Sequence, residues 1–460
     1  MRIFPSALIA LLIWLLAASP VLALVEPEVE SWQQLVKEVE SLPGPLGSLL
    51  GEALNETGGL AGEMASAPLA SLMSELELRR GLKFKYFTPW HVKNRKDFRR
   101  FIARELAKEY TPEKALQEEA VLKALGLVPL DFKIVPFMED LLTDSVAGVY
   151  DPSTDQFFLV DMASGQRLTE RLQAKALTQL TGDTTSTIII HELDHALGGQ
   201  HFPLREVYER LTESSYLDER LAVQALVEGD ATFVMFDHQQ KNPAEQAGEK
   251  LFIAGMDRVT DILMSFPLPL PGMAKFSEAP LFFQKSLIFP YYTGAEFVSE
   301  TRHAGVEGWS LVDGAYINLP HSTEQIFHPN RYMYLVRKPS YPDFSKIPEP
   351  FGDWQTVRDE RGGEFLLRVV LEQYGVDNYR EAADGWHGDT LRVYRHKKTG
   401  ALGFYWVIRW DNAKEAGEFF NSLGAHLPFQ VEQESTATII SLAFDKKQLQ
   451  TLRKAIGKTI

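Results

Sequence analysis

The run His-Glu-Leu-Asp-His at residues 191–195 has the residue types and the spacing of a zinc-dependent catalytic motif. In a helix, His191 and His195 lie one turn apart on the same face, so both imidazoles can reach one metal ion. Glu192 between them can take a proton from a water molecule that the metal activates. We therefore expect His191 and His195 to bind Zn²⁺, one ion per chain, and Glu192 to act as a general base.

The residues around this motif favour a buried helix. His-Glu-x-x-His has only three fixed positions, so its context must support it. Hydroxyl side chains at 184–186 can cap a helix, three isoleucines at 188–190 supply an apolar body, and Gly198-Gly199 predicts the helix end. The alternative is an ordinary amphipathic helix with two histidines at the surface.

Two residues are candidates for the third zinc ligand that a catalytic site needs. One is His201, because residues 191–201 match the metzincin pattern His-Glu-x-x-His-x-x-Gly-x-x-His. The other is Glu228, which lies in an apolar helix expected over 218–239, where a carboxylate needs a partner. A glutamate on the next helix is the gluzincin arrangement.

The sequence favours Glu228 over His201. A metzincin needs a methionine turn beneath the metal, and because Met235 falls inside a predicted helix, only Met273 could serve. His201 is explained equally well as a packed or substrate-facing histidine. Thr232, one turn after Glu228, is expected to orient a ligand, at an offset where gluzincins often have an aspartate.

Further elements predict an α+β protein around this motif. Two β-rich runs within 147–160 flank a turn and predict an antiparallel strand pair just before the active-site helix. An exposed strand edge there could hold an extended substrate, although a hairpin without a substrate role is the alternative. Helices are expected over 93–125 and 169–180, and again up to residue 300 after a Pro-rich linker at 267–271.

The last part of the chain predicts a separate small domain. A Pro-rich stretch at 339–350 is the expected boundary. After it, two β-rich runs over 386–410, a helix at 412–423, a strand at 437–444 and a helix at 446–456 are expected. The predicted domains are a signal peptide (1–23), an N-terminal helical extension (24–88), a mainly helical zincin-like metallopeptidase domain (89–340) and a small C-terminal α+β domain (341–460).

The N-terminus predicts export to the periplasm or the extracellular space. Arg2 precedes an apolar run over 7–18, and small residues suit cleavage after Ala23. The alternative is an uncleaved membrane anchor. Residues 25–86 are expected to form loosely packed helices, either as a propeptide-like segment or as a plain extension.

Composition narrows the chemistry and the partners. A chain of 460 residues is expected to form two or three domains. Because it has no cysteine, thiolate zinc ligands, a cysteine nucleophile and disulfides are excluded. A net charge of −15 argues against a nucleic-acid partner. The expected partner is a protein or peptide substrate, and the oligomeric state stays open.

Five segments of the chain carry a resemblance to a known family. They span about residues 90–335, with a weaker part at 383–389, and they resemble poorly characterised exported bacterial proteins that are presumed gluzincin-type zinc metallopeptidases. In that family the position of Gly198 usually holds a larger residue, which implies that the metzincin match is accidental. The resemblance implies a peptidase domain without a known substrate. The segments are 146–152, 191–202, 225–232, 289–294 and 322–329 with Tyr332.

Hydrolysis also needs a hydrogen-bond donor for the oxyanion that forms in the transition state. Four residues in or beside the downstream family-like segments are candidates. The alternative is that residues 322–329 are a helix start that only packs on the site. The four candidates are Tyr291, His321, His328 and Tyr332.

Together these features predict a zinc-dependent endopeptidase of the cell envelope. Within the enzyme class, the alternative is a metzincin-type protease that uses His201. A second class is a catalytically weak or inactive peptidase-like binding module, against which the intact Glu192 argues. A third class is a structural envelope protein without a metal.

Overall fold

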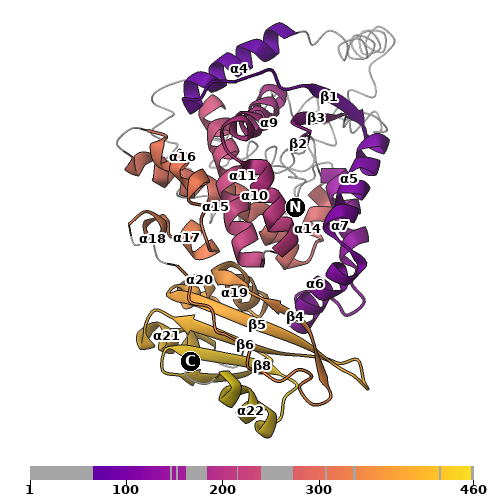
Figure 1. Ribbon diagram of the computed structural model, residues 1–460, viewed down its shortest axis with the longest axis vertical. Coiled ribbons are helices and arrows are strands. Elements are labelled where there is room, and N and C mark those ends of the chain that lie inside the picture. The colour runs from indigo at the N-terminus through magenta and orange to yellow at the C-terminus, as the bar shows by residue number, and fades with distance from the viewer. Residues whose placement is uncertain are drawn as a thin grey trace, which may run out of the picture.

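The computed structural model describes residues 66–145, 148–151, 154–161, 184–214, 216–239, 273–305, 308–334, 338–423 and 426–456 (Figure 1). Over these residues the protein has the expected α+β class. The expected signal peptide, most of the N-terminal extension, the helix at 169–180 and the linker at 267–271 lie outside them. Among the described helices, none combines the length and the apolar character that a membrane span requires.

Three long helices form the centre of the helical part. Helix α11 (Leu217–Gln239) confirms the helix expected there and packs against both α9 (Thr184–His201) and α15 (Leu281–Ala304). At the α11–α15 crossing, a Cβ atom on Gly229 would overlap the backbone of Gly294, and one on Gly294 would overlap α11. The two glycines therefore set how closely these helices approach.

Shorter helices complete the helical part, with α5, α6 and α7 on one side of α11 in Figure 1 and α16 to α18 on the other. The helix expected over 93–125 is two helices, because the chain turns at Tyr110. Thr111 then caps the second helix by accepting a hydrogen bond from the Lys114 N–H. The shorter helices are α5 (Arg95–Glu109), α6 (Pro112–Ala124), α7 (Ile134–Ser145), α10 (Leu204–Ser214), α14 (Met273–Ser277), α16 (Ser310–Ile317), α17 (Thr323–Phe327) and α18 (Pro329–Met333).

A three-stranded sheet precedes α9 in the chain and packs against it. The expected antiparallel pair is confirmed as β2 (Gly148–Asp151) and β3 (Gln156–Asp161). The sequence did not predict β1 (Trp90–Asn94), which pairs parallel to β3 and gives the order β1-β3-β2. Among the described strands, β2 therefore lies at an edge of the sheet.

Residues 66–88 are part of the helical core and not a loosely packed extension. Leu76 and Arg80 of α4 (Ser66–Arg80) are buried, and Leu76 belongs to one apolar cluster with Ile189 and Leu193 of α9. The expectation of loose packing rested on the Gly-, Ala- and Ser-rich run at 44–67, which lies almost entirely outside the described residues. This apolar cluster holds α4 on α9, and the buried Arg80 pairs with Asp230 of α11.

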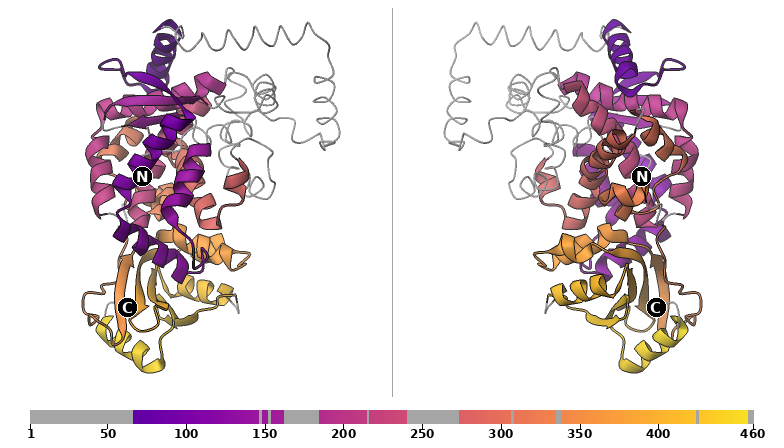
Figure 2. Two further views of the ribbon diagram at one scale, coloured as in Figure 1. Left: turned by 90° about the vertical axis from the view of Figure 1, so that its right-hand side faces the viewer. Right: turned by 90° about the vertical axis from the view of Figure 1, so that its left-hand side faces the viewer.

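The C-terminal unit, residues 338–456, lies at one end of the helical part (Figures 1 and 2). It has an antiparallel sheet in the order β4-β5-β6-β8-β7. The expected strands β5, β6 and β8 and the expected helices α21 and α22 are confirmed. Strands β4 and β7 and helices α19 and α20 were not predicted. For the two strands, the reason is that both are edge strands rich in charged and polar residues. The elements are β4 (Trp354–Glu360), α19 (Gly363–Gln373), α20 (Tyr379–Ala383), β5 (Trp386–His396), β6 (Leu402–Trp410), α21 (Ala413–Leu423), β7 (Gln430–Glu434), β8 (Ala437–Leu442) and α22 (Lys446–Ile456).

Both faces of this sheet are buried. Along β6, Phe404, Trp406 and Ile408 point to one apolar cluster, while Tyr405 and Val407 point to another that includes residues of α22. The first cluster also contains residues of α11, α15 and α19. The apolar core is therefore continuous across residue 340, where the sequence predicted a domain boundary.

We predict that Gly229→Ala disrupts the crossing of α11 and α15. The new Cβ atom cannot fit against Gly294, so the helices must separate, at a cost of about 3 kcal/mol or more. Thermal unfolding measures this loss. The matched control is Gly314→Ala in α16, where a Cβ atom meets nothing within 4 Å. That change should keep or raise the unfolding temperature. Equal destabilisation by both changes would contradict the close-approach argument.

Candidate metal centre

His191, His195 and Glu228 bring three ligand atoms together between α9 and α11. Nε2 of His191 lies 3.1 Å from Nε2 of His195 and 3.2 Å from Oε2 of Glu228. Nε2 of His195 lies 3.4 Å from the same oxygen. In a tetrahedral zinc site with bonds of about 2.0–2.1 Å, the ligand atoms are about 3.3 Å apart. The three side chains therefore already have the spacing that a zinc ion requires.

The surroundings of these atoms also fit a cation. All three side chains are buried, and within the described residues they are the only group of three histidine or carboxylate side chains with ligand atoms this close. Oε1 of Glu228 is buried and has no hydrogen-bond partner among the described residues. Burying a carboxylate oxygen without a hydrogen-bond donor costs free energy, and a bound cation would compensate for that cost.

The charges of the three ligands depend on one another. Burial is the main influence on the pKa of His191 and lowers it, so this ring stays neutral and keeps a lone pair for a metal. Burial acts the same way on His195, but the Glu228 carboxylate outweighs it and raises the pKa of His195 to about 9. Burial acts to raise the pKa of Glu228, yet the two histidines hold it below its ordinary value. Glu228 is therefore an anion, as a zinc ligand must be.

Glu192, the expected general base, lies beside the edge strand β2. Its side chain is fully buried, and a Cβ atom on Gly148 would lie 2.9 Å from its Oε1. Only glycine allows the backbone of β2 to come this close to the carboxylate. The strand edge expected to hold a substrate and the expected base are thus neighbours.

Three tyrosines surround the ligands. The ring of Tyr291 lies 6.1 Å from that of His191, and burial followed by the charge of Glu228 raises the pKa of Tyr291, so its hydroxyl stays protonated. The ring of Tyr150 on β2 lies 6.4 Å from that of His195, and its hydroxyl donates to Asp155. The sequence indicated Tyr291 but missed Tyr150, although Tyr150 lies in a family-like segment.

Tyr208 on α10 is the third of these tyrosines, and the sequence missed it as well. Burial and then the charge of Glu228 raise its pKa, which puts it within electrostatic reach of the site. Nothing in the local sequence signals this, because only the packing of α10 brings it near Glu228.

A buried ion-pair network supports α11 from the side of α4. Nε and Nη2 of Arg80 donate to Oδ2 of Asp230, two residues after Glu228, at 3.1 and 3.0 Å. The Tyr316 hydroxyl donates to the same oxygen at 2.9 Å. Asp194 of the motif is also buried near this arginine, which acts against the rise in the pKa of Asp194 that burial causes. Arg80 therefore ties α4 to α11.

His201, the alternative third ligand, lies away from the other two histidines. Helix α9 does not end at Gly198-Gly199 as expected, but continues to His201. His201 is therefore six residues, or about 9 Å along the helix axis, beyond His195. Its Nε2 lies 2.7 Å from the carbonyl oxygen of Lys83. Gly199 serves a different purpose, because a Cβ atom there would lie 2.5 Å from the Tyr150 hydroxyl oxygen.

Thr232, expected to orient a ligand, is fully buried. Its hydroxyl has no hydrogen-bond partner among the described residues, so no contact with a ligand carries the expected role. Asp230, two residues before Thr232, instead makes the polar contacts on this part of α11.

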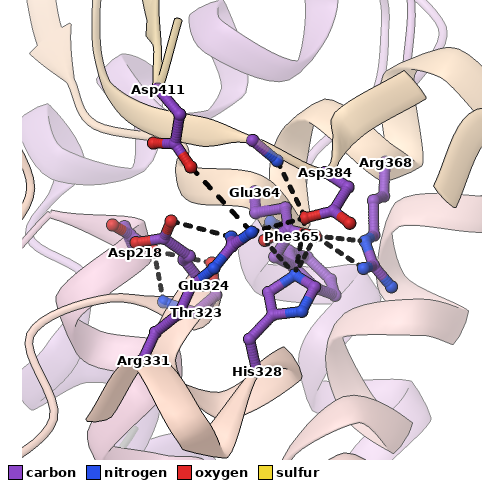
Figure 3. A network of polar contacts seen from close by, with 11 residues as sticks. Asp218, Thr323, Glu324, His328, Arg331, Glu364, Phe365, Arg368, Asp384 and Asp411 are labelled. Atoms are coloured by element: carbon purple, nitrogen blue, oxygen red, sulfur yellow. Dashed lines mark hydrogen bonds and ion pairs between the residues drawn. The ribbon is translucent and has the colours of Figure 1, made fainter. Parts of the chain in front are cut away.

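In the structure, His328 and Tyr332 make polar contacts with residues other than the three candidate ligands. Nε2 of His328 lies 3.0 and 3.1 Å from the two carboxylate oxygens of Glu364 in α19 (Figure 3). The Tyr332 hydroxyl donates to the carbonyl oxygen of Asn318. The backbone N–H of the half-buried His321 donates to the side-chain oxygen of Gln325. We therefore assign these three residues no catalytic role.

The segment that contains His328 joins the helical part to the C-terminal unit. The Thr323 N–H and hydroxyl both donate to Asp218 at the start of α11, each at 2.7 Å. Asp218 is ten residues, or about 15 Å along the axis, before Glu228. Arg331 bridges the buried Glu324 and Asp384, at 2.9 and 2.6 Å (Figure 3). This polar network holds the N-terminal end of the helix that carries Glu228.

Comparison with known proteins reaches only the C-terminal unit. Residues 350–449 match a family described as a domain of unknown function, DUF8575. No curated protein and no solved structure matches the chain. The candidate metal centre lies outside the matched residues, so its interpretation depends on its own geometry.

We predict that the zinc content of purified protein follows the three-residue cluster. Glu228→Ala and His195→Ala should each lower bound zinc from one equivalent to near zero, because two ligands do not hold the ion. His201→Ala should keep the full equivalent, and it is the matched control on α9. Elemental analysis after dialysis measures the content. Zinc retained by Glu228→Ala and lost from His201→Ala would reverse the ligand assignment.

We also predict an acid-dependent loss of stability from Glu364. Burial acts to raise the pKa of Glu364, but Arg368 and His328 hold it below its ordinary value of 4.5. The folded state therefore favours the ionised carboxylate, so this stabilisation is present above pH 4.5 and is lost as the pH falls below it. Thermal unfolding of the metal-free protein from pH 6.5 to 3.5 measures the effect.

Glu364→Gln should be less stable than the wild type at pH 6.5 by about 3 kcal/mol and unfold at a lower temperature, because it leaves the half-buried Arg368 without its carboxylate partner. The difference should narrow below pH 4.5. Glu300→Gln, at an exposed position of α15, is the control and should change the unfolding temperature neither at pH 6.5 nor below pH 4.5. A difference that stays constant with pH would exclude the ionised carboxylate as its cause.

Proposed function

We propose that this protein is a zinc-dependent peptidase of the gluzincin type. The observation that carries the proposal is the spacing of 3.1 to 3.4 Å among the Nε2 atoms of His191 and His195 and Oε2 of Glu228. Two imidazoles and one carboxylate are the ligand set of thermolysin-like catalytic zinc sites. The absence of cysteine and the expected export agree with an enzyme of the cell envelope that needs no thiolate.

The bound ion would supply a polarised water of lowered pKa and a positive charge for the carbonyl oxygen under attack. Glu192 lies next to a ligand on the same helix, so its carboxylate can accept a proton from that water and deliver it to the leaving amine. Gly148 and the other residues that enclose Glu192 exclude bulk water. The lower dielectric constant strengthens the electrostatic interaction between the Glu192 carboxylate and a proton.

Tyr291 is the residue that we assign to the oxyanion. Its buried hydroxyl lies near Glu228 and stays protonated, so it can donate a hydrogen bond to a developing negative charge. Tyr150 is less suitable, because its hydroxyl already donates to Asp155.

Strand β2 is the element that we assign to substrate binding. It is an edge strand among the described strands, and it begins beside Glu192. An extended peptide that pairs with such an edge gains backbone hydrogen bonds without regard to its sequence. Unstructured polypeptide is therefore the substrate class that the strand favours.

We predict that Glu192→Gln lowers peptide cleavage at least about 100-fold while the protein keeps one equivalent of zinc. Tyr291→Phe should lower kcat about 10- to 100-fold with little change in KM, because its hydroxyl acts on the transition state. Cleavage of an unstructured, fluorescently labelled casein measures both.

The matched control is His201→Gln, which removes a histidine of the same helix that lies outside the cluster, against the Lys83 carbonyl oxygen, and should keep the cleavage rate within about twofold. Zinc content and unfolding temperature are measured for every variant. If Glu192→Gln cleaves casein as fast as the wild type, the proposed mechanism is wrong. If the wild type binds zinc but cleaves no polypeptide, the protein is a binding module.

A further inference from the structure

Helices α4, α9 and α11 pack against one another at a second group of polar side chains, outside the candidate metal centre. Each helix contributes one residue to this group: Glu75, Ser186 and His238. Nδ1 of His238 lies 2.9 Å from Oε1 of Glu75, and Nε2 of the same ring lies 3.4 Å from Oγ of Ser186. The imidazole therefore bridges a carboxylate and a hydroxyl, as the histidine of a Ser-His-acid catalytic triad does.

The two contacts of His238 determine where its ring can hold a proton. An ionised carboxylate only accepts hydrogen bonds, so Nδ1 carries the proton that points at Glu75. In the neutral ring, Nε2 then has a lone pair, and the Ser186 hydroxyl can donate to it. A separation of 3.4 Å is long for this hydrogen bond, but such contacts often shorten only when a substrate is bound.

Glu75 is the anion of this group. Burial acts to raise its pKa, but the hydrogen bonds from His238 and Arg79 hold the pKa below its ordinary value of 4.5. Nε of Arg79 donates to Oε1 of Glu75 at 2.8 Å, and its Nη1 donates to Asp237 at 2.7 Å. Arg79 thus fixes Glu75 beside the residue that precedes His238. The carboxylate can therefore stabilise the positive charge that His238 gains when it accepts a proton.

Ser186 lies where a helix end favours negative charge. It is the third residue of α9, and it is half-buried. The N–H groups in the first turn of a helix have no acceptor within the helix, and the helix dipole places partial positive charge there. A negative charge that develops on a carbonyl oxygen beside the Ser186 hydroxyl is therefore stabilised at this end of α9.

The group is separate from the candidate metal centre and open to small molecules. Ser186 is five residues before His191, which is about 7.5 Å along the axis of α9. His238 is ten residues after Glu228, which is about 15 Å along the axis of α11. The His238 side chain is 15% exposed and the Glu75 side chain 36% exposed, so solvent reaches the group. Attack by an activated serine needs no metal ion.

We propose that Ser186, His238 and Glu75 form a second, metal-independent site that hydrolyses carboxylic esters through an acyl-enzyme. Oγ of Ser186 attacks the ester carbonyl carbon while its proton passes to Nε2 of His238. The bond to the alcohol oxygen breaks, and the alcohol leaves with that proton. Water then attacks the acyl-enzyme and gives a proton to Nε2, which returns it to Ser186 as the acid is released. Small esters are the substrate class, because a partly exposed site encloses too little of a substrate to supply the binding energy that an amide would require.

The first test uses full-length protein that carries Glu192→Gln, so that the metal centre does not contribute to ester hydrolysis. A fluorophosphonate probe, which reacts with activated serine hydroxyls, should label Ser186, and peptide mass spectrometry identifies the labelled residue. Ser186→Ala and His238→Gln should each lower labelling at least about 100-fold. The matched control is Ser299→Ala. The Ser299 hydroxyl also lies 3.4 Å from a histidine nitrogen, Nδ1 of His303, but among the described residues no carboxylate pairs with that ring, so labelling should not change.

Ester turnover checks the role of each group. With p-nitrophenyl acetate, Ser186→Ala should abolish the initial burst of p-nitrophenol that acyl-enzyme formation produces. Glu75→Gln should lower kcat about 10-fold and leave KM unchanged, because the carboxylate acts through His238 and not on the substrate. Zinc content and unfolding temperature, measured for every variant, should change little.

Labelling of Ser186 that depends on His238 would support the site. Labelling of a different serine, no labelling, or ester hydrolysis that Ser186→Ala leaves intact would contradict it. Because the Glu192 base is missing in these tests, their outcome does not depend on whether the metal centre cleaves peptides.

Discussion

The fold is organised around one buried carboxylate between two imidazoles. Glu228 lies 3.2 and 3.4 Å from the Nε2 atoms of His191 and His195, and all three side chains are withdrawn from water. Such a group is stable only if its charge is matched, so α9 and α11 must be held in one relative position. The close crossing of Gly229 and Gly294 supports α11 from α15, and Arg80 supports α11 from α4. These contacts stabilise the position of the site as well as the core.

The C-terminal unit takes part in the same arrangement. Its sheet shares an apolar core with α11 and α15, and its helix α19 contributes Glu364 to the polar network around His328. Through Thr323 and Asp218, this network reaches the first turn of α11. Because a helix transmits a displacement along its length, the contacts of the C-terminal unit bear on where Glu228 lies. Residues 350–449, the part that matches a known family model, thus include a structural support of the candidate site.

Two sets of polar groups in the helical part have separate uses. One set lies near the three candidate metal ligands and consists of Glu192 and the tyrosines, which can hold or donate a proton. The other set, around His328 and Arg331, fixes one part of the protein to another. Both sets combine histidine with buried carboxylates, so residue types alone do not separate them. What separates them is whether ring nitrogens and carboxylate oxygens converge on one point, as at Glu228, or form pairs along an interface, as at Glu364.

The sequence by itself determined the α+β class, the hairpin β2–β3, helices α9 and α11, and the cluster of His191, His195 and Glu228. These predictions depend on local periodicity and on the cost of burying a charge, both of which are visible in the order of residues. Only the tertiary structure decided that α9 continues past Gly198, that α4 is part of the core, and that Tyr150 and Tyr208 lie near the ligands. It also decided that His328 contacts Glu364 of the C-terminal unit and that the Tyr332 hydroxyl donates to the Asn318 carbonyl oxygen. The physical reason is that these features depend on contacts between segments far apart in the chain, such as Gly199 with Tyr150 and His328 with Glu364, and no local pattern encodes such contacts.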